Sequence, residues 1–401
     1  MPSASAILTC LLVSAASRAE APTEPHEMTI VPLLGGDSDV GFGGGYILSY
    51  ARLPRGYWPY LWRLEAAGAA TFKPGDDGGL QMPYLDDYVL LHLPHVIWSK
   101  LELKLRLSYT REATLKFAGL GNASRLAPRL DSVHRSSKHA RTHPTLRWSA
   151  LYHVDHGLDI TWGAAYTHNW LDVPEDTLLA QKMRAGTDDE RSLLGDARTQ
   201  GNVQFSVGAA YDTRDNETNP RAGQYHLGRA DLASGGTREI PNRWARVWLA
   251  THVYVPLLPE RLTFAARVAS DLLLGPAPFF ELPRLDDTFF GGGNGIRGVP
   301  GQRYWGKVKI LSNLELRSEL LPFHFWHKRN VLGVTAFFDF GRLWTGFSSH
   351  PGLDGPLPGL KFGTGLGLRV AAGSSFVVRA DFAYSPDAYP IGAYITSGHM
   401  F

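Results

Sequence analysis

The sequence predicts an all-β protein, a transmembrane antiparallel β-barrel of about sixteen strands. Side chains alternate with a period of two in many segments, most clearly in Leu101–Tyr109, where leucine and tyrosine alternate with Glu102, Lys104 and Arg106. After the first twenty-one residues no run of about 18 apolar residues occurs, and mean hydropathy is −0.15, which excludes membrane helices. Strands of a transmembrane barrel need be apolar only at alternate positions, so a transmembrane barrel is still compatible with this sequence.

Sixteen segments have the length and composition of strands. They occur near 27–34, 40–52, 59–72, 86–95, 99–111, 144–155, 157–170, 201–212, 223–234, 242–256, 260–273, 306–321, 331–345, 359–371, 374–385 and 391–401. An even number of antiparallel strands is typical of bacterial outer-membrane barrels.

The connections between these segments alternate in length. Short ones such as 96–98, 257–259 and 372–373 take turns with long ones. Short periplasmic turns and long outer loops are expected of an outer-membrane barrel, whereas a soluble sandwich has no reason to sort its loops in this way. Aromatic residues such as Trp162 and Trp170 lie near strand ends, as in an interfacial girdle. The long connections are near 73–85, 112–143, 171–200, 274–305 and 346–358.

Composition limits the partners and the stabilising devices. The chain has 40 Lys+Arg against 38 Asp+Glu, a net charge of +2, too balanced for a nucleic-acid surface. Its one cysteine, Cys10, lies in the apolar run Ala4–Ala16, which with the small residues after it predicts a cleaved signal peptide over residues 1–21. We therefore expect a single mature domain, 22–401, without disulfides or thiolate metal sites.

The connection before the sixth segment is basic. Residues 122–143 contain five cationic side chains and three histidines, with Asp131 as the one acid. Such a loop could bind the phosphates of lipopolysaccharide, and it could equally be a solvated loop with no ligand. The basic residues are Arg125, Arg129, Arg135, Lys138 and Arg141, and the histidines are His134, His139 and His143.

No catalytic constellation stands out. Residues 36–40, Gly-Asp-Ser-Asp-Val, lack the second glycine of a nucleophile elbow. His153 and His156 bracket a tight turn with no evident third ligand, which argues against zinc. We expect neither an enzyme nor a bound metal or cofactor.

Several motifs, in order along the chain, resemble those of the bacterial surface antigen superfamily, which includes BamA and TamA. Residues 211–223 resemble its periplasmic-turn signature, through Asp212, Arg214, Asp215, Pro220 and Gly223. Residues 291–298 resemble its Arg-Gly loop motif, through Gly293, Ile296, Arg297 and Gly298. The order continues with 313–317, with 337–344 including Gly341, with 365–369 and with a final Phe401.

The resemblance implies a barrel that helps to insert or translocate proteins at the outer membrane, with its Arg-Gly loop near 274–305 folded inward. It implies as partners outer-membrane lipid and lipopolysaccharide, unfolded outer-membrane protein clients and separate periplasmic proteins. The sequence departs from the family at Ile296, where valine is usual, and at Val299-Pro300, where an aromatic is usual. The soluble periplasmic repeats of BamA and TamA are missing. A passive outer-membrane pore is the alternative.

Alternation along two strands suggests how the loop is held. In the segment 306–321, Val308, Leu314 and other apolar residues occupy alternate positions and are expected to face lipid, so Glu315, between them, is expected to face the lumen. In the segment 331–345, the apolar residues of 332–340 occupy alternate positions in the same way, so Asp339 is expected to face the lumen. A guanidinium between two carboxylates can bond to both, so we expect Arg297 to pair with Glu315 and Asp339. Otherwise the two acids would line a wet pore and Arg297 would be a surface charge.

The seam between the first and last strands is expected to pair weakly. Pro32 lacks an amide, and Gly35 and Gly36 favour a kink in the first strand. In the last strand, Ile391 and Ile395 are expected to face outward and Phe401 to anchor the chain at the periplasmic interface. An insertion factor could use such an edge as a template, whereas a pore would gain nothing from it.

Overall fold

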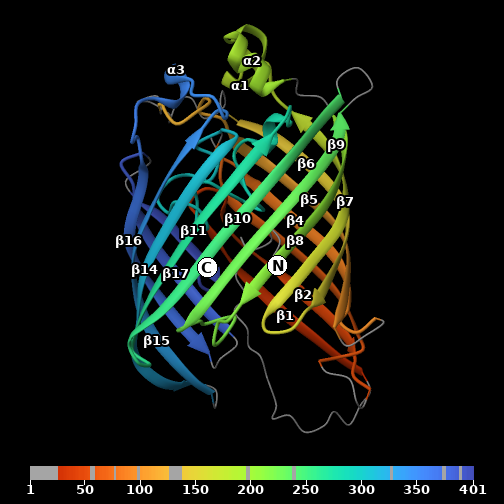
Figure 1. Cartoon of the computed structure of the whole chain (residues 1–401), viewed down its shortest axis with the longest axis vertical. Helices are drawn as coiled ribbons and strands as arrows, with labels where there is room; N and C mark the ends of the chain where they lie inside the picture. Colours follow the sequence, from red (N-terminus) through yellow and green to blue (C-terminus); the bar gives the residue numbers. More distant parts are fainter. Residues whose placement is uncertain are drawn as a thin grey trace.

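Sixteen antiparallel strands close into one barrel in the computed structural model (Figure 1). The structure describes residues 26–54, 59–75, 78–96, 100–125, 138–195, 199–236, 241–325, 328–372, 376–387 and 391–401. Each strand pairs with its neighbours in the chain, and β1 closes the barrel against β18. The predicted fold class and the number of wall strands are therefore confirmed.

The strand bounds follow the predicted segments closely. The first eight wall strands are β1 (His26–Asp37), β2 (Gly41–Arg52), β3 (Trp62–Pro74), β4 (Leu80–Leu93), β5 (Leu101–Lys116), β6 (Lys138–His153), β7 (Leu158–Asp172) and β8 (Gln200–Asp212). The second eight are β9 (Gly223–Gly236), β10 (Pro241–Leu258), β11 (Leu262–Leu274), β14 (Val308–Phe325), β15 (Lys328–Trp344), β16 (Lys361–Ala372), β17 (Phe376–Tyr384) and β18 (Gly392–Ser397).

The wall has an apolar outer face and a polar inner face. Leu105 and Leu107 are 46% and 57% exposed on the outside, while their neighbours Lys104 and Arg106 face the lumen. A strand that separates lipid from a hydrated interior must alternate in this way, which is why the period of two located the strands. Among the described residues, no helix is long and apolar enough to cross a membrane.

Several predicted strand ends are wrong. β4 begins at Leu80 and not near residue 86, and β5 continues to Lys116 and does not end near residue 111. β6 begins at Lys138, so the part of the basic segment from 138 to 143 belongs to the wall and not to an outer loop. Arg141 is 5% exposed, and its Nε donates to Asn169 Oδ1 of β7 over 2.9 Å. Arg129, His134 and Arg135 lie outside the described residues. β18 ends at Ser397, because the chain then turns into the lumen.

A dome of two short helices covers the end of the barrel that carries the long loops (Figure 1). They are α1 (Leu178–Ala185) and α2 (Asp188–Leu194), and a third, α3 (Pro351–Asp354), follows β15. A capping box starts α2, with Thr187 as its N-cap. Burial raises the pKa of the Glu190 carboxyl, but hydrogen bonds from Lys182 and from the Thr187 amide outweigh it and leave the pKa below its usual value.

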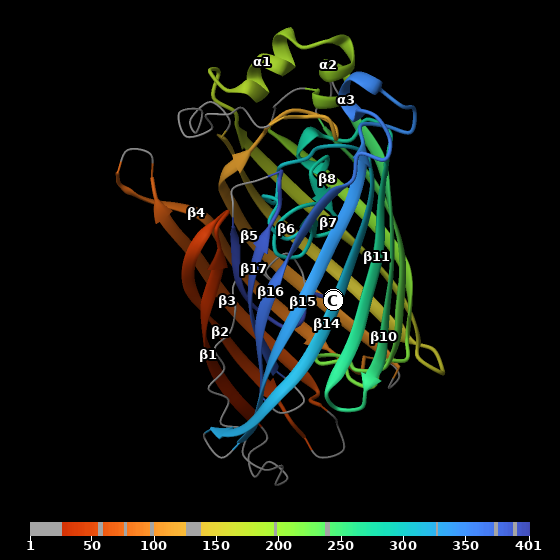
Figure 2. The ribbon, with the colours of Figure 1, turned by 90° about the vertical axis from the view of Figure 1, so that its left-hand side faces the viewer.

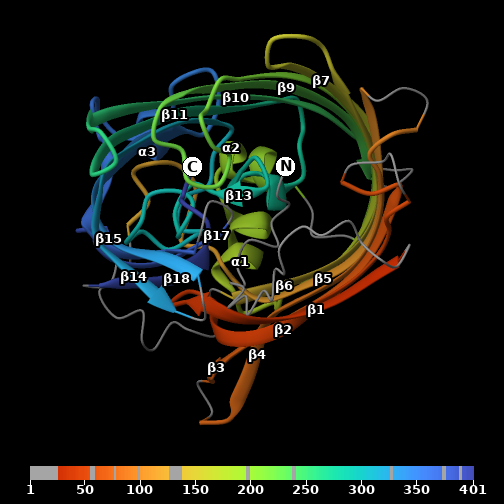
Figure 3. The ribbon, with the colours of Figure 1, turned by 90° about the horizontal axis from the view of Figure 1, so that it is seen from below.

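The dome is fastened by an apolar cluster. Leu179 of α1 and Leu194 of α2 are buried against Phe279 and Trp305, which belong to the connection between β11 and β14. Seen from the opposite end, the helices and this connection lie across the barrel opening (Figure 3). The helices therefore close the long-loop end by packing on a second element inside the barrel.

The connection between β11 and β14, residues 275–307, folds into the barrel as expected. We call it the inward loop. It contains a 3₁₀ turn at Phe279–Glu281 and a small hairpin of β12 (Arg284–Leu285) and β13 (Thr288–Phe289). Its apolar side chains, including the fully buried Phe290 and Ile296, pack on the inner wall around Leu311 of β14.

Candidate functional site: the inward loop and the closing seam

Close backbone approach lets the inward loop reach the wall. Gly298 has φ +90°, and a Cβ atom there would lie about 3 Å from the main chain of Tyr384 and Ser385. The Arg297 carbonyl oxygen lies close to Gly363 of β16. A Cβ atom on Gly363 would be only 1.8 Å from that oxygen. Glycine on both surfaces is thus what allows contact at this depth.

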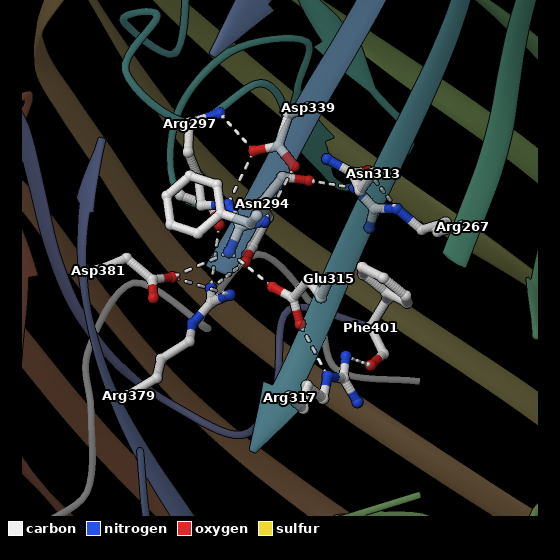
Figure 4. Close-up of polar contacts among 12 residues, drawn as sticks. Arg267, Asn294, Arg297, Asn313, Glu315, Arg317, Asp339, Arg379, Asp381 and Phe401 are labelled. Atoms are coloured by element: carbon white, nitrogen blue, oxygen red, sulfur yellow. Dashed lines mark hydrogen bonds and ion pairs between the residues drawn. The ribbon is translucent and has the colours of Figure 1, made fainter. Parts of the chain in front are cut away.

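Arg297 lies at the centre of the contact, with its side chain fully buried. Its Nε and Nη2 donate to the two oxygens of Asp339 over 2.7 and 2.9 Å, and its own amide donates to Asp339 Oδ2 over 3.1 Å. Its Nη1 donates to Glu315 Oε1 over 2.6 Å (Figure 4). The guanidinium carbon also lies 3.5 Å from the centre of the Phe337 ring. The planar group is therefore engaged at its edge and on its face.

A third carboxylate, from β17, completes the cluster. Asp381 accepts from Arg297 Nη1 over 3.2 Å and from Arg369 Nη1 over 2.5 Å. Glu315 also accepts from Arg317 Nε over 2.8 Å. The inward loop is consequently tied to four wall strands, β14 to β17, through one arginine and its neighbours.

Amide and carbonyl groups of the loop make further bonds to wall arginines. Arg267 of β11 donates to the Asn294 carbonyl over 2.7 Å, and Arg379 of β17 donates to the Gly293 carbonyl over 3.0 Å. Gly293 itself lies against the Tyr394 ring, which a Cβ would meet at 3.1 Å. The loop is thereby held on both sides of Arg297.

The seam between β1 and β18 is a short ladder. It consists of the pairs Gly36–Ile395 and Asp37–Tyr394, extended by a hydrogen bond from Ser38 N to the carbonyl of Ala393 over 3.1 Å. β1 pairs with β2 along all twelve of its residues. The seam is thus short, but the expected cause is wrong, because β1 is one continuous strand and Gly36 lies inside the ladder.

The inward loop bonds to both sides of this seam. The Gly298 amide donates to the Tyr394 hydroxyl of β18 over 3.0 Å, and the Gly301 amide donates to Asp39 Oδ2, in the turn after β1, over 2.9 Å. Lys73 of β3 donates to the Asp39 carbonyl over 2.8 Å and supports that turn. We call these two amide bonds the clasp. One loop thus contacts both strands that close the barrel.

The last residues do not anchor the chain at the membrane interface, as the sequence suggested. Phe401 lies in the lumen, where its ring is 5.5 Å from that of His252 and 6.3 Å from that of Tyr254. Arg317 Nη2 donates to the main-chain oxygen of Phe401 over 3.0 Å. The arginine side chains of the inner wall can bind the face of an aromatic ring. Here Phe401 makes this interaction in the lumen and does not lie at the membrane interface.

The turn motif between β8 and β9 folds back on itself. Asp212 accepts from Arg214 Nε and Nη2 over 2.9 and 2.6 Å, and Asp215 Oδ1 accepts from two main-chain amides of residues 221 and 222. Pro220 is buried, and Gly223 has φ +98°. Arg221 then binds Glu319 of β14 through both its oxygens, so the turn is attached to a strand that also holds Arg297.

A family model described as the Omp85 superfamily domain matches residues 83–392. The chain belongs to the Omp85 superfamily. This match confirms the resemblance carried by the motifs. As an Omp85 barrel the protein lies in the outer membrane of Gram-negative bacteria, so the short turns face the periplasm and the dome faces the exterior.

Solved structures share the fold of this Omp85 barrel. BamA from Haemophilus ducreyi lacking POTRA domains 1–3 is 13% identical, with a TM-score of 0.63 over 98% of this chain and 74% of that one. CdiB from Escherichia coli is 15% identical, with a TM-score of 0.55 over 97% of this chain and 67% of that one. No curated protein matches the sequence.

The structure of this Omp85 barrel brings together Arg297, Glu315 and Asp339. Gly341 lies next to the inward loop, because a Cβ atom on Gly341 would be 3.0 Å from the Phe290 ring of that loop. Asp381 was not predicted, although the apolar residues Phe376, Val378 and Phe382 have the opposite parity and the same alternation would have turned Asp381 inward. The clasp had no local signal, because its partners lie far apart in the chain.

His153, near the periplasmic rim, is engaged in hydrogen bonds. His153 Nδ1 lies 2.8 Å from Asp159 Oδ1, and its Nε2 lies 3.1 Å from Glu102. In the part of the chain that the structure describes, no group of three histidine, cysteine or acidic side chains is arranged to hold a metal ion.

Proposed function

We propose that this Omp85 barrel assists the insertion or translocation of polypeptides at the outer membrane by opening between β1 and β18. The two-pair ladder of the seam carries the proposal. Other neighbours of these strands pair over much longer ladders, and separating two pairs takes far less free energy than separating twelve. A strand edge exposed there could pair with a client strand through main-chain hydrogen bonds.

The inward loop would hold this opening shut. Its clasp joins β18 to the turn after β1, and its Arg297 cluster fixes the loop to β14–β17. Release of the clasp would free β1 from β18 without disturbing the neighbouring ladders. The loop is consequently placed to couple events in the lumen to the state of the seam.

A passive pore agrees less well with the contents of the barrel. The inward loop fills one side of the lumen, and the dome packs on it at the outer end (Figure 3). A cavity of about 450 Å³ lies between the loop and β4–β8, with Glu102, Arg106 and Arg147 in its lining. A barrel of this strand number conducts when its lumen is open, and here the inward loop and the dome occupy part of it.

The partners follow from this mode of action. We propose that the clients are unfolded outer-membrane or exported polypeptides delivered by separate periplasmic proteins. Lipid and lipopolysaccharide would surround the apolar wall. Template pairing of strands needs no covalent chemistry, so we propose no enzymatic step.

A disulfide across the seam tests the proposal. The register places Ser38 opposite Ala393, so the pair to introduce is Ser38→Cys with Ala393→Cys. Gly36 is unsuitable because a Cβ there would lie 2.1 Å from the Gly41 carbonyl oxygen. Partners in an antiparallel ladder have Cα atoms about 4.5–5.5 Å apart, which suits a disulfide.

The assay is insertion of an unfolded small outer-membrane barrel into liposomes that contain the purified protein. We expect oxidation to abolish assisted insertion and reduction to restore it. The matched control is Thr29→Cys with Ser49→Cys, which links β1 to β2 and should leave activity intact when oxidised. Full activity with the seam locked, together with a large steady ion conductance, would instead favour the pore.

A further inference from the structure

A small cavity at the periplasmic end of the lumen is surrounded by hydrogen-bond donors. It measures about 30 Å³ and lies among Arg317, Thr335, Arg369 and His399, between β14, β15, β16 and the last residues of the chain. Roughly 10–15 Å³ of such space holds one water molecule, so this cavity has room for a small ion. It is separate from the seam and from the clasp.

Several buried donors at this cavity have no hydrogen-bond partner. They are Arg317 Nη1, Arg369 Nε and Nη2, and Thr335 Oγ1. Thr335 is fully buried, Arg369 is 4% exposed and Arg317 is 6% exposed. A buried charged donor without an acceptor is costly, typically more than a neutral one, so an acceptor in the cavity would be stabilising.

Both arginines use some of their N–H groups for partners outside the cavity. Arg317 uses Nε for Glu315 and Nη2 for the Phe401 oxygen, which leaves Nη1. Arg369 uses Nη1 for Asp381, and its Nη2 is 3.7 Å from Glu315, an ion pair without a hydrogen bond. The donors that remain belong to residues that line the cavity.

The local charge favours an anion over water. In the buried cluster around Arg297, five guanidinium groups face three side-chain carboxylates, and Arg317 also binds the main-chain oxygen of Phe401, so cationic side chains are in excess. The rim carboxylates do not cancel them, because Glu319 is bound by Arg221 and Glu260 is exposed. The guanidinium groups are Arg267, Arg297, Arg317, Arg369 and Arg379, and the carboxylates are Glu315, Asp339 and Asp381.

We propose that this cavity is a binding site for a small inorganic anion of about the size of chloride. The anion would accept hydrogen bonds from Arg317, Arg369 and Thr335 and would offset part of the excess positive charge. Because these residues come from the three neighbouring strands β14, β15 and β16, anion binding would hold those strands together on the inner wall. The site takes no part in the clasp, so it stands independently of the proposed function.

Bromide is the probe for this site, because it resembles chloride and scatters anomalously. We expect crystals of the full barrel soaked in sodium bromide to show an anomalous peak within hydrogen-bond distance of Arg317, Arg369 and Thr335. In detergent, titration with bromide against gluconate at constant ionic strength should raise the unfolding temperature in a saturable way. Constant ionic strength removes general screening as an explanation.

The conservative variant is Thr335→Val, which keeps the volume of the side chain and removes one donor to the ion. Loss of a hydrogen bond to a charged group predicts about tenfold weaker bromide binding or more. Arg369→Gln should abolish the saturable shift, and Arg184→Gln on the exposed helix α1 is the charge-matched control. No peak in the cavity, equal effects of bromide and gluconate, or unchanged binding in Thr335→Val would each overturn the assignment.

Discussion

Replacement of Arg297 by alanine should destabilise the barrel by several kcal/mol. The Asp339 carboxylate accepts three hydrogen bonds from Arg297, and it is fully buried. Breaking a buried ion pair by deleting one partner costs about 3–5 kcal/mol, because a charge is left uncompensated. Glu315 and Asp381 retain Arg317 and Arg369, which places the expected loss near 3 kcal/mol.

The measurement is the free energy of unfolding in a urea titration, followed by tryptophan fluorescence and by heat-modifiable mobility on gels. Arg297→Lys should lie between the wild type and alanine, because lysine keeps the charge and loses the planar fork. The matched control is Arg191→Ala in α2, whose partner Asp188 is exposed and whose loss should cost under about 0.5 kcal/mol.

A double substitution identifies the cause. Asp339→Asn removes the stranded carboxylate, so its combination with Arg297→Ala should cost less than the sum of the single changes, by about 0.5–3 kcal/mol. An Arg297→Ala protein within about 0.5 kcal/mol of the wild type would refute this reasoning. Strict additivity of the two changes would refute it as well.

Three other outcomes follow from the geometry. Gly363→Ala should displace the inward loop and expose it to protease, since its Cβ would collide with the Arg297 carbonyl, whereas Gly228→Ala, with 3.5 Å to its nearest neighbour, should not. Tyr394→Phe removes one bond of the clasp and should speed disulfide exchange across the seam, measured with the paired cysteines. Hydrogen bonds lower the pKa of Glu190 in the folded protein. The ionised carboxylate therefore stabilises α2 at pH values above the unfolded-state pKa near 4.5, and this stabilisation is lost as the pH falls through the folded-state pKa. The protection of α2 amides from hydrogen exchange should decrease as the pH falls through this range. Protection factors, corrected for the intrinsic exchange rate, that do not change with pH would contradict this.

Local alternation was enough to predict the wall and part of the site. A strand between lipid and a polar lumen must place one parity on each side, so Glu315 and Asp339 could be turned inward from their neighbours alone. The same rule was not applied to β6, where the polarity of Arg141 and His143 suggested a loop, although polar side chains are expected on a luminal face. The resemblance to the family added the link between Arg297 and these acids.

The closure of the barrel could not be predicted in this way. The Gly301–Asp39 bond joins residues 262 positions apart, and its formation depends on the register between the two ends of the chain. The inward course of Phe401 likewise depends on competition between an interface and a cation-rich wall, which no local pattern expresses. Tertiary geometry decides both.

The alternation of the inner wall also restricts how the barrel can move. If β14 slid by one residue against β11, Lys309, Glu315 and Arg317 would exchange sides with leucines and enter the lipid. Each cationic side chain at the bilayer midplane costs about 2–4 kcal/mol, so such a slip is excluded in practice. Strand movement must therefore preserve register within the wall. Opening at the seam is confined to rotation of whole strands away from one another, without sliding along their length. The β3–β4 hairpin that leans away from the wall (Figure 2) is separated from the seam by β1 and β2.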